Sequence, residues 1–431
     1  MAMLGSVERD VPPSGAIDTQ ELSYSQSYGL VGKRMAVVSF SAFPGDPRPR
    51  RAAEAFAEAG MSVEVICLKD AGAPKKDTFK GIQIDRIGIE KSRDSKLGYM
   101  FQYCLFILIA FMMLTLRFPT RRYHVVHIHN MPDVLVFAAL VPKLFGAKVI
   151  LDLHDPMPEL MMTIFNVGKE SWAVKTTAFL EKWSIAFADL VLTVNRTCEE
   201  LFVSRSGGAS KISVVMNTPD EQIFRYSPAK LDVARVPRKG EPFVIMYHGT
   251  LVERNGLDLA VEALAKVRRS IPGAELRVYG PRTSFLDTVL SGLPEKELEK
   301  AVHYLGPRTL EELVQAIAQC DVGVIPNKRS IFTEINTPTR IFEYLALGKP
   351  VVAPRSSGIE AYFDKDSLVL FELGNVDDLA MKLSWVAIHP REAIETTKHG
   401  QVIYQKHVWS REKEKLLGLT AALLRRGDKL S

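Results

Sequence analysis

Short runs rich in β-branched residues alternate with helical stretches along most of the chain, and this alternation is what most limits the possible folds. It is typical of parallel sheets whose strands are joined by crossover helices, such as the helices we expect at 50–59 and 133–145. In the first half, the expected strands are Met35–Phe40, Ser62–Leu68, Gly81–Ile87, Val125–His129, Lys148–Leu153, Leu190–Val194 and Ile212–Met216. In the second half, they are Phe243–Tyr247, Glu275–Gly280, His303–Gly306, Val322–Pro326, Lys349–Ala353 and Ser367–Phe371. The fold class is therefore α/β.

The chain is long enough for two domains, because its 431 residues exceed the size at which a single core stops growing. The strand pattern is interrupted after Asn217, in a stretch containing Pro and Lys that ends at Pro242. We expect a disordered leader over 1–33, a Rossmann-like acceptor domain over 34–225, a Rossmann-like nucleotide domain over 235–400 and a C-terminal helix over 401–431. Two such sheets would face a central cleft, where open α/β sheets bind ligands.

Composition argues against several classes of protein. A formal net charge of +5 is too small for this length to indicate nucleic-acid binding. The four cysteines lie far apart without a CxxC pair, which argues against a metal site or a disulfide framework. The first 33 residues lack the apolar run of a secretory signal, so we expect a cytoplasmic protein.

The segment Tyr99–Phe118 contains an apolar run from Cys104 to Leu116, shorter than the roughly 20 residues that span a bilayer. Three interpretations stay open for a helix over 97–118: a buried domain helix, a helix in the membrane interface, and a true span. Basic residues around it would suit an anionic membrane surface, although charges on a solvated face give the same pattern. They are Lys75, Lys76, Lys80, Lys91, Arg93, Lys96, Arg117, Arg121 and Arg122.

Polar residues follow three of the strands expected in the first half. The loop after the first strand contains Gly45 and precedes a helix, whose N-terminus favours an anion. Its spacing fits neither a dinucleotide fingerprint nor a P-loop. His129 ends one later strand, and His154 with Asp155 follows the next. Zinc accepts the ligand types of His129, His154 and Asp155, but nothing in their spacing defines a geometry, so we expect no metal. Ordinary loop or core histidines are the alternative.

The second half carries two loops that suit a diphosphate. In Met246–Asp258 a strand leads through Gly249 and Arg254 into a helix, and the planar guanidinium of Arg254 matches a diphosphate.

The second of these loops lies in Asn336–Pro350, which contains a helix with Pro338 in its first turn. Backbone N–H groups near Thr339 and Arg340 would be free for phosphate oxygens. Glu343, one turn further, could accept hydrogen bonds from two ribose hydroxyls, although an exposed helix glutamate would look the same.

The stretch from Pro338 to Ala353, PTRIFEYLALGKPVVA, resembles the donor-binding helix of the retaining glycosyltransferases of family four, which have the two-domain GT-B fold. The resemblance covers nearly the whole chain after the leader. It implies that Glu343 binds the donor ribose, that the Gly45 loop approaches the diphosphate, and that His129 contacts the transferred sugar. It also implies that Tyr404–Leu424 is a final helix that returns to the first domain.

Three departures from the family pattern concern the donor site. Eight residues before Glu343, where the family has another glutamate, stands Ile335, with Glu334 one place off. Thr250 follows Gly249 where the family has arginine, and Asn255 replaces a loop lysine beside Arg254.

We expect retaining transfer of a sugar from a nucleotide-diphosphate donor to a hydroxyl of a lipid-linked or polysaccharide acceptor. No cofactor or metal is expected, because Arg254 and helix N–H groups would stabilise the leaving group. The expected setting is the inner face of a bacterial cell membrane, in contact with anionic lipid. Two other classes stay open: a non-catalytic protein that binds nucleotide or a partner, and a sugar-nucleotide epimerase using Asp155 and Glu159.

Overall fold

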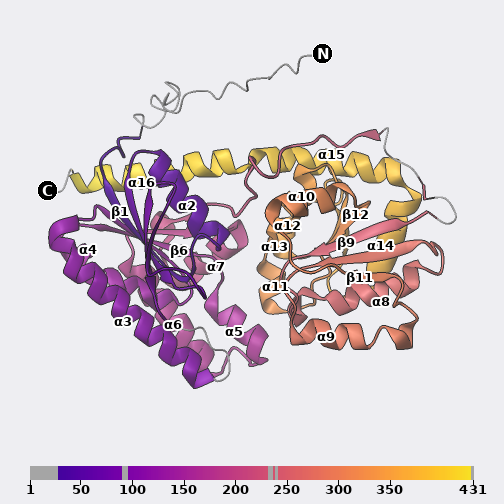
Figure 1. Ribbon diagram of the computed structural model, residues 1–431, viewed down its shortest axis with the longest axis horizontal. Helices are drawn as coiled ribbons and strands as arrows, with labels where there is room; N and C mark the ends of the chain where they lie inside the picture. Colours follow the sequence, from indigo (N-terminus) through magenta and orange to yellow (C-terminus); the bar gives the residue numbers. More distant parts are fainter. Residues whose placement is uncertain (1–27, 90–95, 232–235, 238–240, 429–431) are drawn as a thin grey trace, which may run out of the picture.

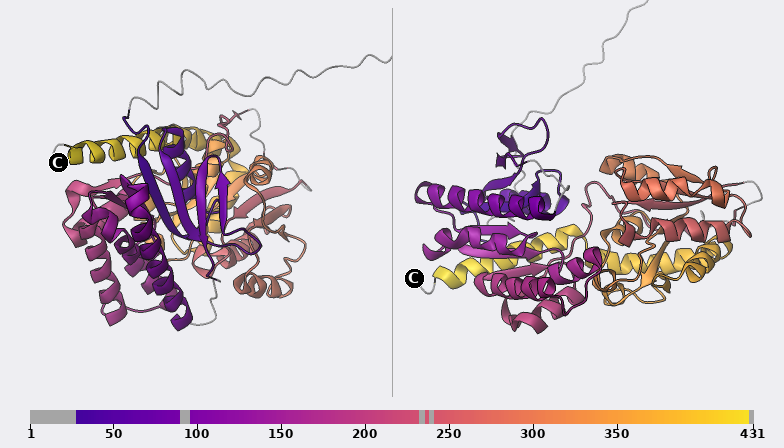
Figure 2. Two further views of the ribbon diagram at one scale, coloured as in Figure 1. Left: turned by 60° about the vertical axis from the view of Figure 1, so that its left-hand side comes forward. Right: turned by 90° about the horizontal axis from the view of Figure 1, so that it is seen from below.

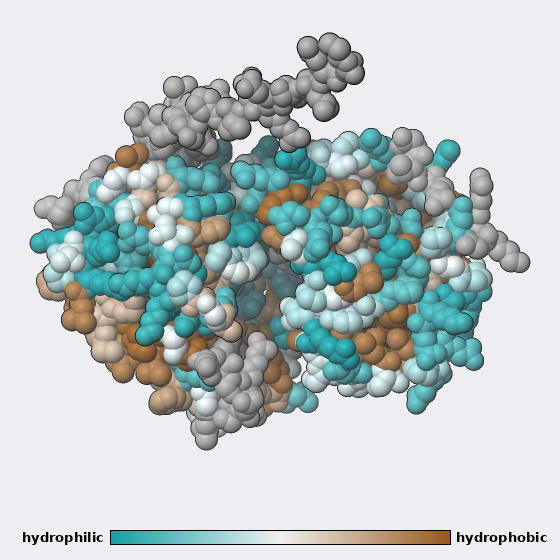
Figure 3. All heavy atoms as spheres, in the orientation of Figure 1, coloured by the Kyte–Doolittle hydropathy of each residue, from teal (hydrophilic) through white to brown (hydrophobic). Residues whose placement is uncertain are grey.

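The computed structural model describes residues 28–89, 96–231, 236–237 and 241–428, and it contains two parallel sheets, each covered by helices on both faces (Figure 1). The first sheet is built from residues before the linker at 215–242, and the second from residues after it. Each sheet belongs to one domain. Between the two domains the surface is hollowed (Figure 3).

The first sheet has eight strands in the order β3-β4-β2-β1-β5-β6-β7-β8. Its strands are β1 Arg34–Ala42, β2 Ser62–Leu68, β3 Lys76–Phe79, β4 Ile82–Ile87, β5 Val125–His129, β6 Lys148–Leu153, β7 Leu190–Thr193 and β8 Ile212–Val214. Only the edge strand β3 pairs antiparallel. The order reverses between β1 and β5, and ligands of open α/β sheets bind at such a point. There the register aligns Ser39, His129 and Asp152 on β1, β5 and β6.

Helices cover the two faces of the first sheet in separate layers. One face packs against α2 Pro47–Glu58 and the C-terminal helix α16 Trp409–Asp428. The other face is covered by α3 Lys96–Arg121, η1 Asp133–Ala139, α6 Trp172–Phe187 and α7 Arg196–Ser206. The short helices α4 Leu140–Leu144, α5 Met157–Phe165 and η2 Ala209–Lys211 complete the domain.

The second sheet has six strands in the order β11-β10-β9-β12-β13-β14, with its reversal between β9 and β12. Its strands are β9 Phe243–His248, β10 Ala274–Tyr279, β11 Val302–Tyr304, β12 Val322–Val324, β13 Val351–Arg355 and β14 Val369–Glu372. One face packs on α8 Leu257–Val267, α9 Ser284–Ser291 and α14 Val376–Ile388. The other packs on α10 Leu310–Ala318, α12 Thr339–Ala346, α13 Ser357–Glu360 and α15 Pro390–Lys406. The remaining short helices are η4 Glu253–Asn255, η5 Pro294–Lys296 and α11 Ile331–Ile335.

The end of the chain crosses from the second domain to the first (Figure 1). Tyr404 in α15 is buried in the second domain, whereas Leu416 and Leu417 in α16 are buried in the first. Lys413 forms an ion pair with Glu58 of α2. The expected single helix over Tyr404–Leu424 is instead two helices that meet at His407 and Val408, because α15 ends at Lys406.

Three sequence expectations differ from the structure at element boundaries. Leu30 is buried in the first core and Gly32 N–H bonds Gly60 O, so the expected disordered leader over 1–33 is wrong for 28–33, while 1–27 lie outside the described residues. The helix expected over 133–145 is a 3₁₀ helix followed by α4. β3 was not expected, because a polar edge strand such as KDTF lacks the apolar alternation that marks a strand.

Helix α3 lies on the first sheet with one apolar face inward and one outward. Phe106, Ala110 and Leu114 are completely buried, whereas Phe101 and Leu116 are 67% and 78% exposed. The apolar helix is longer than the apolar run that the sequence analysis identified. Its segment Met100–Arg121 is long and apolar enough to cross a membrane, judged by length and composition alone. Since its inner face forms part of the domain core, a span would remove that face from the sheet.

The basic flank expected to meet a membrane is partly neutralised. Arg117 pairs with Glu64 and Asp85, and Lys80 pairs with Glu54. Lys91 and Arg93 lie outside the described residues. Helix α3 alone therefore presents less positive charge than its sequence indicated.

Candidate functional site

The loop after β1 turns into α2 at the reversal point of the first sheet. Gly45 is exposed in this loop, and the side chain of Asp46 caps α2 by accepting a hydrogen bond from Arg48 N–H at 3.3 Å. A Cβ at Gly45 would make only ordinary contact, with Ala42 O at 3.6 Å. The described part of the chain therefore does not itself require glycine here, and the diphosphate role of Gly45 stays a prediction.

The ends of β5 and β6 form a buried polar cluster, which we call the histidine cluster: His127, His129, Asp152 and His154. The two atoms His129 Nδ1 and His154 Nε2 lie 3.0 Å apart, and Asp152 Oδ2 is 3.4 Å from His129 Nδ1. The Asp152 carboxylate also lies 3.6 Å from His127 Nε2. Adjacent parallel strands bring these side chains together, as expected for carboxyl ends that meet at one edge.

His129 is completely buried, although the resemblance implied that it contacts the transferred sugar. Asp152 and His154 cover it, and the side chain of His154 is 20% exposed. The structure therefore places His154, not His129, at the surface of this cluster. Burial lowers the pKa of His154 to about 4, and burial together with His127 lowers the pKa of His129 well below its ordinary value. Both imidazoles are neutral near pH 7.

Arg48, at the start of α2, supplies the charge that balances this cluster. Its Nη2 donates to Asp152 Oδ1 at 2.7 Å, and its Nη1 donates to Val215 O at 2.9 Å. Burial by itself would raise the pKa of Asp152, but the Arg48 guanidinium and the neighbouring histidines hold it well below its ordinary value. Arg48 thus links the Gly45 loop, the histidine cluster and the start of the linker.

The residues that could hold a metal ion differ from those the sequence suggested. Among the described residues, His127, His129 and Asp152 group their ligand atoms within 4.8 Å, and Asp155 is outside that group. The guanidinium of Arg48 already pairs with Asp152, so a divalent cation bound there would place a second positive charge next to this buried group. The paired guanidinium therefore argues against a divalent cation in this cluster, even though among the described residues both ring nitrogens of His127 and Nε2 of His129 are buried without a hydrogen-bond partner.

Sequence reasoning missed Arg48 and Asp152. A signal was present for Asp152, because a carboxylate between Leu151 and Leu153 in a buried strand needs a buried partner. Nothing in the sequence identifies Arg48 as that partner, since 104 residues separate them.

In the second domain, the loop after β9 carries Gly249 and leads to Arg254. Gly256 allows this turn, because its φ is +69° and a Cβ there would come 1.9 Å from Pro326 O. The guanidinium of Arg254 lies over the Phe332 ring, 5.8 Å from its centroid.

Arg254 also acts across the domain boundary. Burial raises the pKa of Asp155 in the first domain, and Arg254 opposes that rise. Arg254 in the second domain is therefore close enough to Asp155 in the first domain for their charges to interact.

Helix α12 carries three of the expected donor residues. Pro338 is its N-cap, not a residue of its first turn as expected, and Thr339 is the first helical residue. Among the described residues, no hydrogen bond is found for the backbone N–H groups of Thr339 and Arg340. These groups point from the helix N-terminus, which favours a bound anion.

Glu343 is held by a partner that the sequence analysis did not assign. Glu343 Oε2 lies 2.5 Å from His248 Nε2, and His248 Nδ1 lies 2.9 Å from the Tyr344 hydroxyl. The Tyr344 hydroxyl donates to Met246 O at 2.8 Å. The Glu343 side chain remains 14% exposed, so the carboxylate is oriented by His248 while still reachable.

Arg340 packs against the same loop. Its Nη1 donates to His248 O at 2.7 Å, and its guanidinium lies 4.9 Å from the Tyr247 ring centroid. A Cβ on Gly249, whose φ is +117°, would lie 3.3 Å from Arg340 Cδ. The structure therefore brings Gly249, Arg340 and Glu343 together around His248, and the donor role expected for these three residues stays a prediction.

The linker touches the first residue of α12, and the first domain touches the segment that precedes this helix. Asn217 Nδ2 donates to Thr339 Oγ1 at 3.1 Å, and Asn195 Nδ2 donates to Ile335 O at 3.0 Å. Glu334 accepts from Ser357 N–H at 3.0 Å, so this glutamate holds α13 in place. The side chain of Glu334 is thus used locally in this structure.

Comparison with known proteins connects both halves to glycosyl transferases. Residues 46–218 match the family described as glycosyl transferase 4-like domain, and residues 242–388 match glycosyl transferases group 1. The glycogen synthase of Mycobacterium tuberculosis is 25% identical over 42% of this chain and 41% of its own length. The D-inositol 3-phosphate glycosyltransferase of Corynebacterium urealyticum is 30% identical over 40% of this chain and 42% of its own length. The alignments thus span less than half the length of these curated relatives.

Solved structures show the same two-domain arrangement. Sucrose-phosphate synthase from Thermosynechococcus elongatus superposes with a TM-score of 0.71 at 18% identity, covering 93% of this chain and 100% of that chain. Anabaena HepE in complex with UDP and glucose superposes with a TM-score of 0.67 at 16% identity, covering 90% and 100%. At these identities the likeness establishes the fold, which is GT-B.

Proposed function

Because this chain belongs to the family-four glycosyltransferases of the GT-B fold, we propose that it transfers a sugar from a nucleoside-diphosphate donor to an acceptor hydroxyl. The observation that carries the proposal is the group around His248: the oriented carboxylate of Glu343 lies one turn from the free N–H groups of Thr339 and Arg340. A carboxylate next to a helix N-terminus can bind a ribose and a diphosphate at once. The similarity to glycosyltransferases supports the class of reaction, and the structure of HepE was solved in complex with UDP and glucose.

We place the donor with its ribose on Glu343 and its diphosphate at the N-terminus of α12. Arg254 then lies on the same side of the hollow, where its guanidinium would stabilise the negative charge that develops on the leaving diphosphate. Because these groups are fixed in the protein, the proposed reaction uses no metal or other cofactor.

The proposed transfer retains the anomeric configuration. The bond between the sugar C1 and the phosphate oxygen breaks, and the acceptor oxygen forms a bond to C1 on the same face. The acceptor proton passes to the departing phosphate oxygen, so the products are the glycoside and the nucleoside diphosphate. Holding donor and acceptor in one hollow supplies the orientation that this step requires.

The first-domain side of the hollow would receive the acceptor. His154 and Asp155 are partly exposed polar residues that follow β6 there, and His129 acts behind them by fixing the ring of His154. A membrane-linked acceptor at the inner face of the cell membrane suits the exposed apolar side of α3.

A thermal-shift screen with nucleoside diphosphates and sugar nucleotides tests the proposal, because ligands stabilise the folded state by mass action. One nucleotide should raise the melting temperature, and Glu343→Ala should remove most of that rise. Loss of hydrogen bonds to a charged group weakens binding by roughly 10- to 100-fold. Glu311→Ala, an exposed first-turn glutamate of α10, is the matched control and should leave the shift unchanged.

Two results would count against the proposal. If no nucleotide shifts the melting temperature, the donor site is absent. If a nucleotide binds but no donor sugar is released or transferred to any acceptor, the non-catalytic alternative is favoured.

A further inference from the structure

Helix α6 carries an aromatic stripe on its outer side. Trp172, Phe179 and Trp183 are 78%, 56% and 57% exposed, and their spacing of seven and four residues places them on one face. The rings of Phe179 and Trp183 lie 5.4 Å apart. The opposite face is anchored, since Val174 and Ile185 are buried in the domain. The stripe is therefore held outward by a well-packed helix.

This stripe belongs to a larger apolar surface. α3 and α6 both pack on η1 and cover the same face of the first sheet (Figures 1 and 2). The outer residues Leu108 and Leu116 of α3 are 53% and 78% exposed, and Leu144 of α4 is 73% exposed. Hydrophobic residues gather over this lower part of the first domain (Figure 3). We call the outer surface of α3, α4 and α6 the apolar layer.

The charges beside the apolar layer are mainly positive. Lys169 and Lys182 are exposed at or next to α6, and Arg122 is exposed after α3, whereas the exposed Lys175 pairs with Glu170 at 2.8 Å. The one acidic residue within α6 is Glu181, and it is buried against Arg205. Tryptophans with nearby lysines are typical of protein surfaces that lie in the headgroup region of a membrane.

We propose that the apolar layer docks on a bilayer containing anionic lipid, with the α6 stripe at headgroup level and Lys169 and Lys182 on lipid phosphates. An exposed apolar surface drawn from three helices marks a site of interaction with a membrane or a protein, and its lysine border complements anionic headgroups. No sequence pattern had indicated the α6 stripe, and the lysines beside it, Lys169 and Lys182, add to the positive charge that α3 loses when Arg117 is paired.

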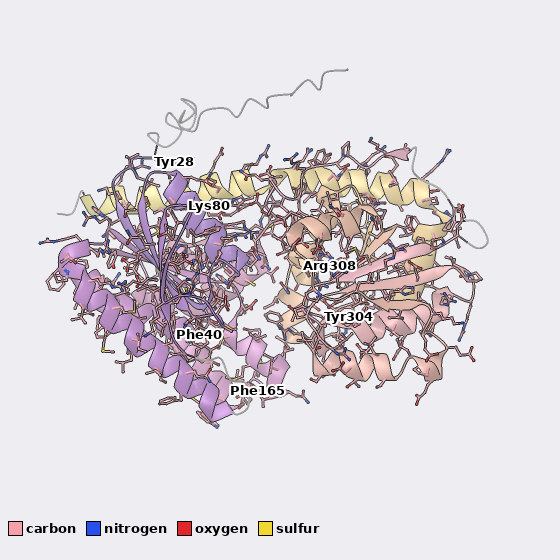
Figure 4. All side chains as sticks on the ribbon, viewed as in Figure 1. Tyr28, Phe40, Lys80, Phe165, Tyr304 and Arg308 are labelled. Atoms are coloured by element: carbon pink, nitrogen blue, oxygen red, sulfur yellow. The ribbon has the colours of Figure 1, made fainter. Side chains whose placement is uncertain are left out.

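Helix α5 connects the docked surface to the proposed donor site. Its last residues Ile164 and Phe165 are 52% and 44% exposed, and Phe165 lies on the underside of the first domain (Figure 4). The adjacent Thr163 Oγ1 accepts from Phe332 N–H at 3.4 Å, and the Phe332 ring lies under Arg254. A lipid-linked acceptor could therefore reach the hollow directly from the bilayer, a consequence that rests on the proposed function.

Flotation of the full chain with phosphatidylcholine vesicles, with and without phosphatidylglycerol, tests the docking. The wild type should float with the anionic vesicles at low salt. The triple variant Trp172→Ser, Phe179→Ser, Trp183→Ser should partition at least tenfold less, because bound apolar area sets the affinity. The matched control removes three similarly exposed apolar side chains from the second domain and should float like the wild type: Met381→Ser, Ile388→Ser, Val402→Ser.

The lysines give a second, electrostatic readout. Lys169→Gln and Lys182→Gln should each weaken partitioning about fivefold, since a cation near an anionic surface contributes about 1 kcal/mol. Lys365→Gln and Lys406→Gln, on the second domain, should have no effect. High salt should reduce the difference between the lysine variants and the wild type.

The proposal is overturned if the wild type does not float, or if the triple variant floats as well as its control. It is also overturned if the triple variant instead converts a dimer to a monomer in light scattering, because the stripe would then bind a second copy. Flotation needs no nucleotide and the thermal shift needs no vesicle. A triple variant that keeps the nucleotide-induced shift but does not float therefore separates this inference from the proposed function.

Discussion

Replacing Asp152 by asparagine should destabilise the first domain strongly, because it leaves a buried cation unpaired. The side chains of Arg48 and Asp152 are only 8% and 3% exposed. Arg48 Nε lies 3.1 Å from both carboxylate oxygens, and Nη2 lies 2.7 Å from Oδ1. Breaking one side of such a buried pair costs roughly 3–5 kcal/mol of unfolding free energy. For a domain of this size, that corresponds to a fall in melting temperature of roughly 10 °C.

The assay is thermal and urea unfolding of four proteins: the wild type, Asp152→Asn, Arg48→Met and the double variant. The double variant should recover at least half of the loss, since removing both charges removes the desolvation penalty. Asp287→Asn is the matched control, because it breaks an exposed pair with Arg282 whose side chains are 67% and 50% exposed. Asp287→Asn should lower the free energy of unfolding by less than about 1 kcal/mol.

The reasoning is refuted if Asp152→Asn lowers the free energy of unfolding no more than Asp287→Asn does. It is also refuted if the losses in the double variant simply add, because the two side chains would then not be coupled.

Two further predictions concern buried groups outside the proposed substrate contacts. Burial, with the nearby Asp133 carboxyl, raises the pKa of Glu181 to about 8. Between the unfolded pKa of about 4.5 and about 8, the folded protein keeps a proton that the unfolded chain releases, so stability falls as pH rises through this window. In urea unfolding, the stability of Glu181→Gln relative to the wild type should therefore increase as the pH rises from about 5 to about 9. A difference in unfolding free energy that stays the same across this pH range would contradict the prediction. Gly323→Ala should lower the free energy of unfolding by roughly 1–3 kcal/mol and weaken nucleotide binding, because its Cβ would lie 2.4 Å from the Tyr344 ring that holds His248. Gly292→Ala, whose Cβ would make only ordinary contacts, should change neither stability nor binding. Equal effects of the two substitutions would refute the explanation.

The donor side of the candidate site was the part most accessible to sequence reasoning. Arg340 and Glu343 lie three residues apart, so one helix places both on adjacent turns whatever surrounds them. Gly249 was also identified, because it begins a glycine-bracketed loop that leads from a strand into a helix. His248 stands next to it but has no local signal for its role, since its partner Glu343 is 95 residues away.

The first-domain side was predicted less well, for a physical reason. Alternation along β5 shows that His127 and His129 share a face, but it does not show what covers that face. In the structure, Arg48 from α2 and Asp152 from β6 fill the space, so His129 is buried and His154 takes the exposed position.

The sequence by itself determined the α/β class, the two-sheet division and most strand positions, because hydrophobic periodicity and turn residues act over short stretches of chain. Only the tertiary structure decided which charges are paired, which histidine is exposed and which apolar stripes face outward. Arg117 looked like a free cation in the sequence and is paired with Glu64, whereas Trp172 and Trp183, to which the sequence analysis assigned no role, are exposed on one face of α6. Pairing and exposure depend on contacts between residues far apart in the chain, and local pattern carries no information about them.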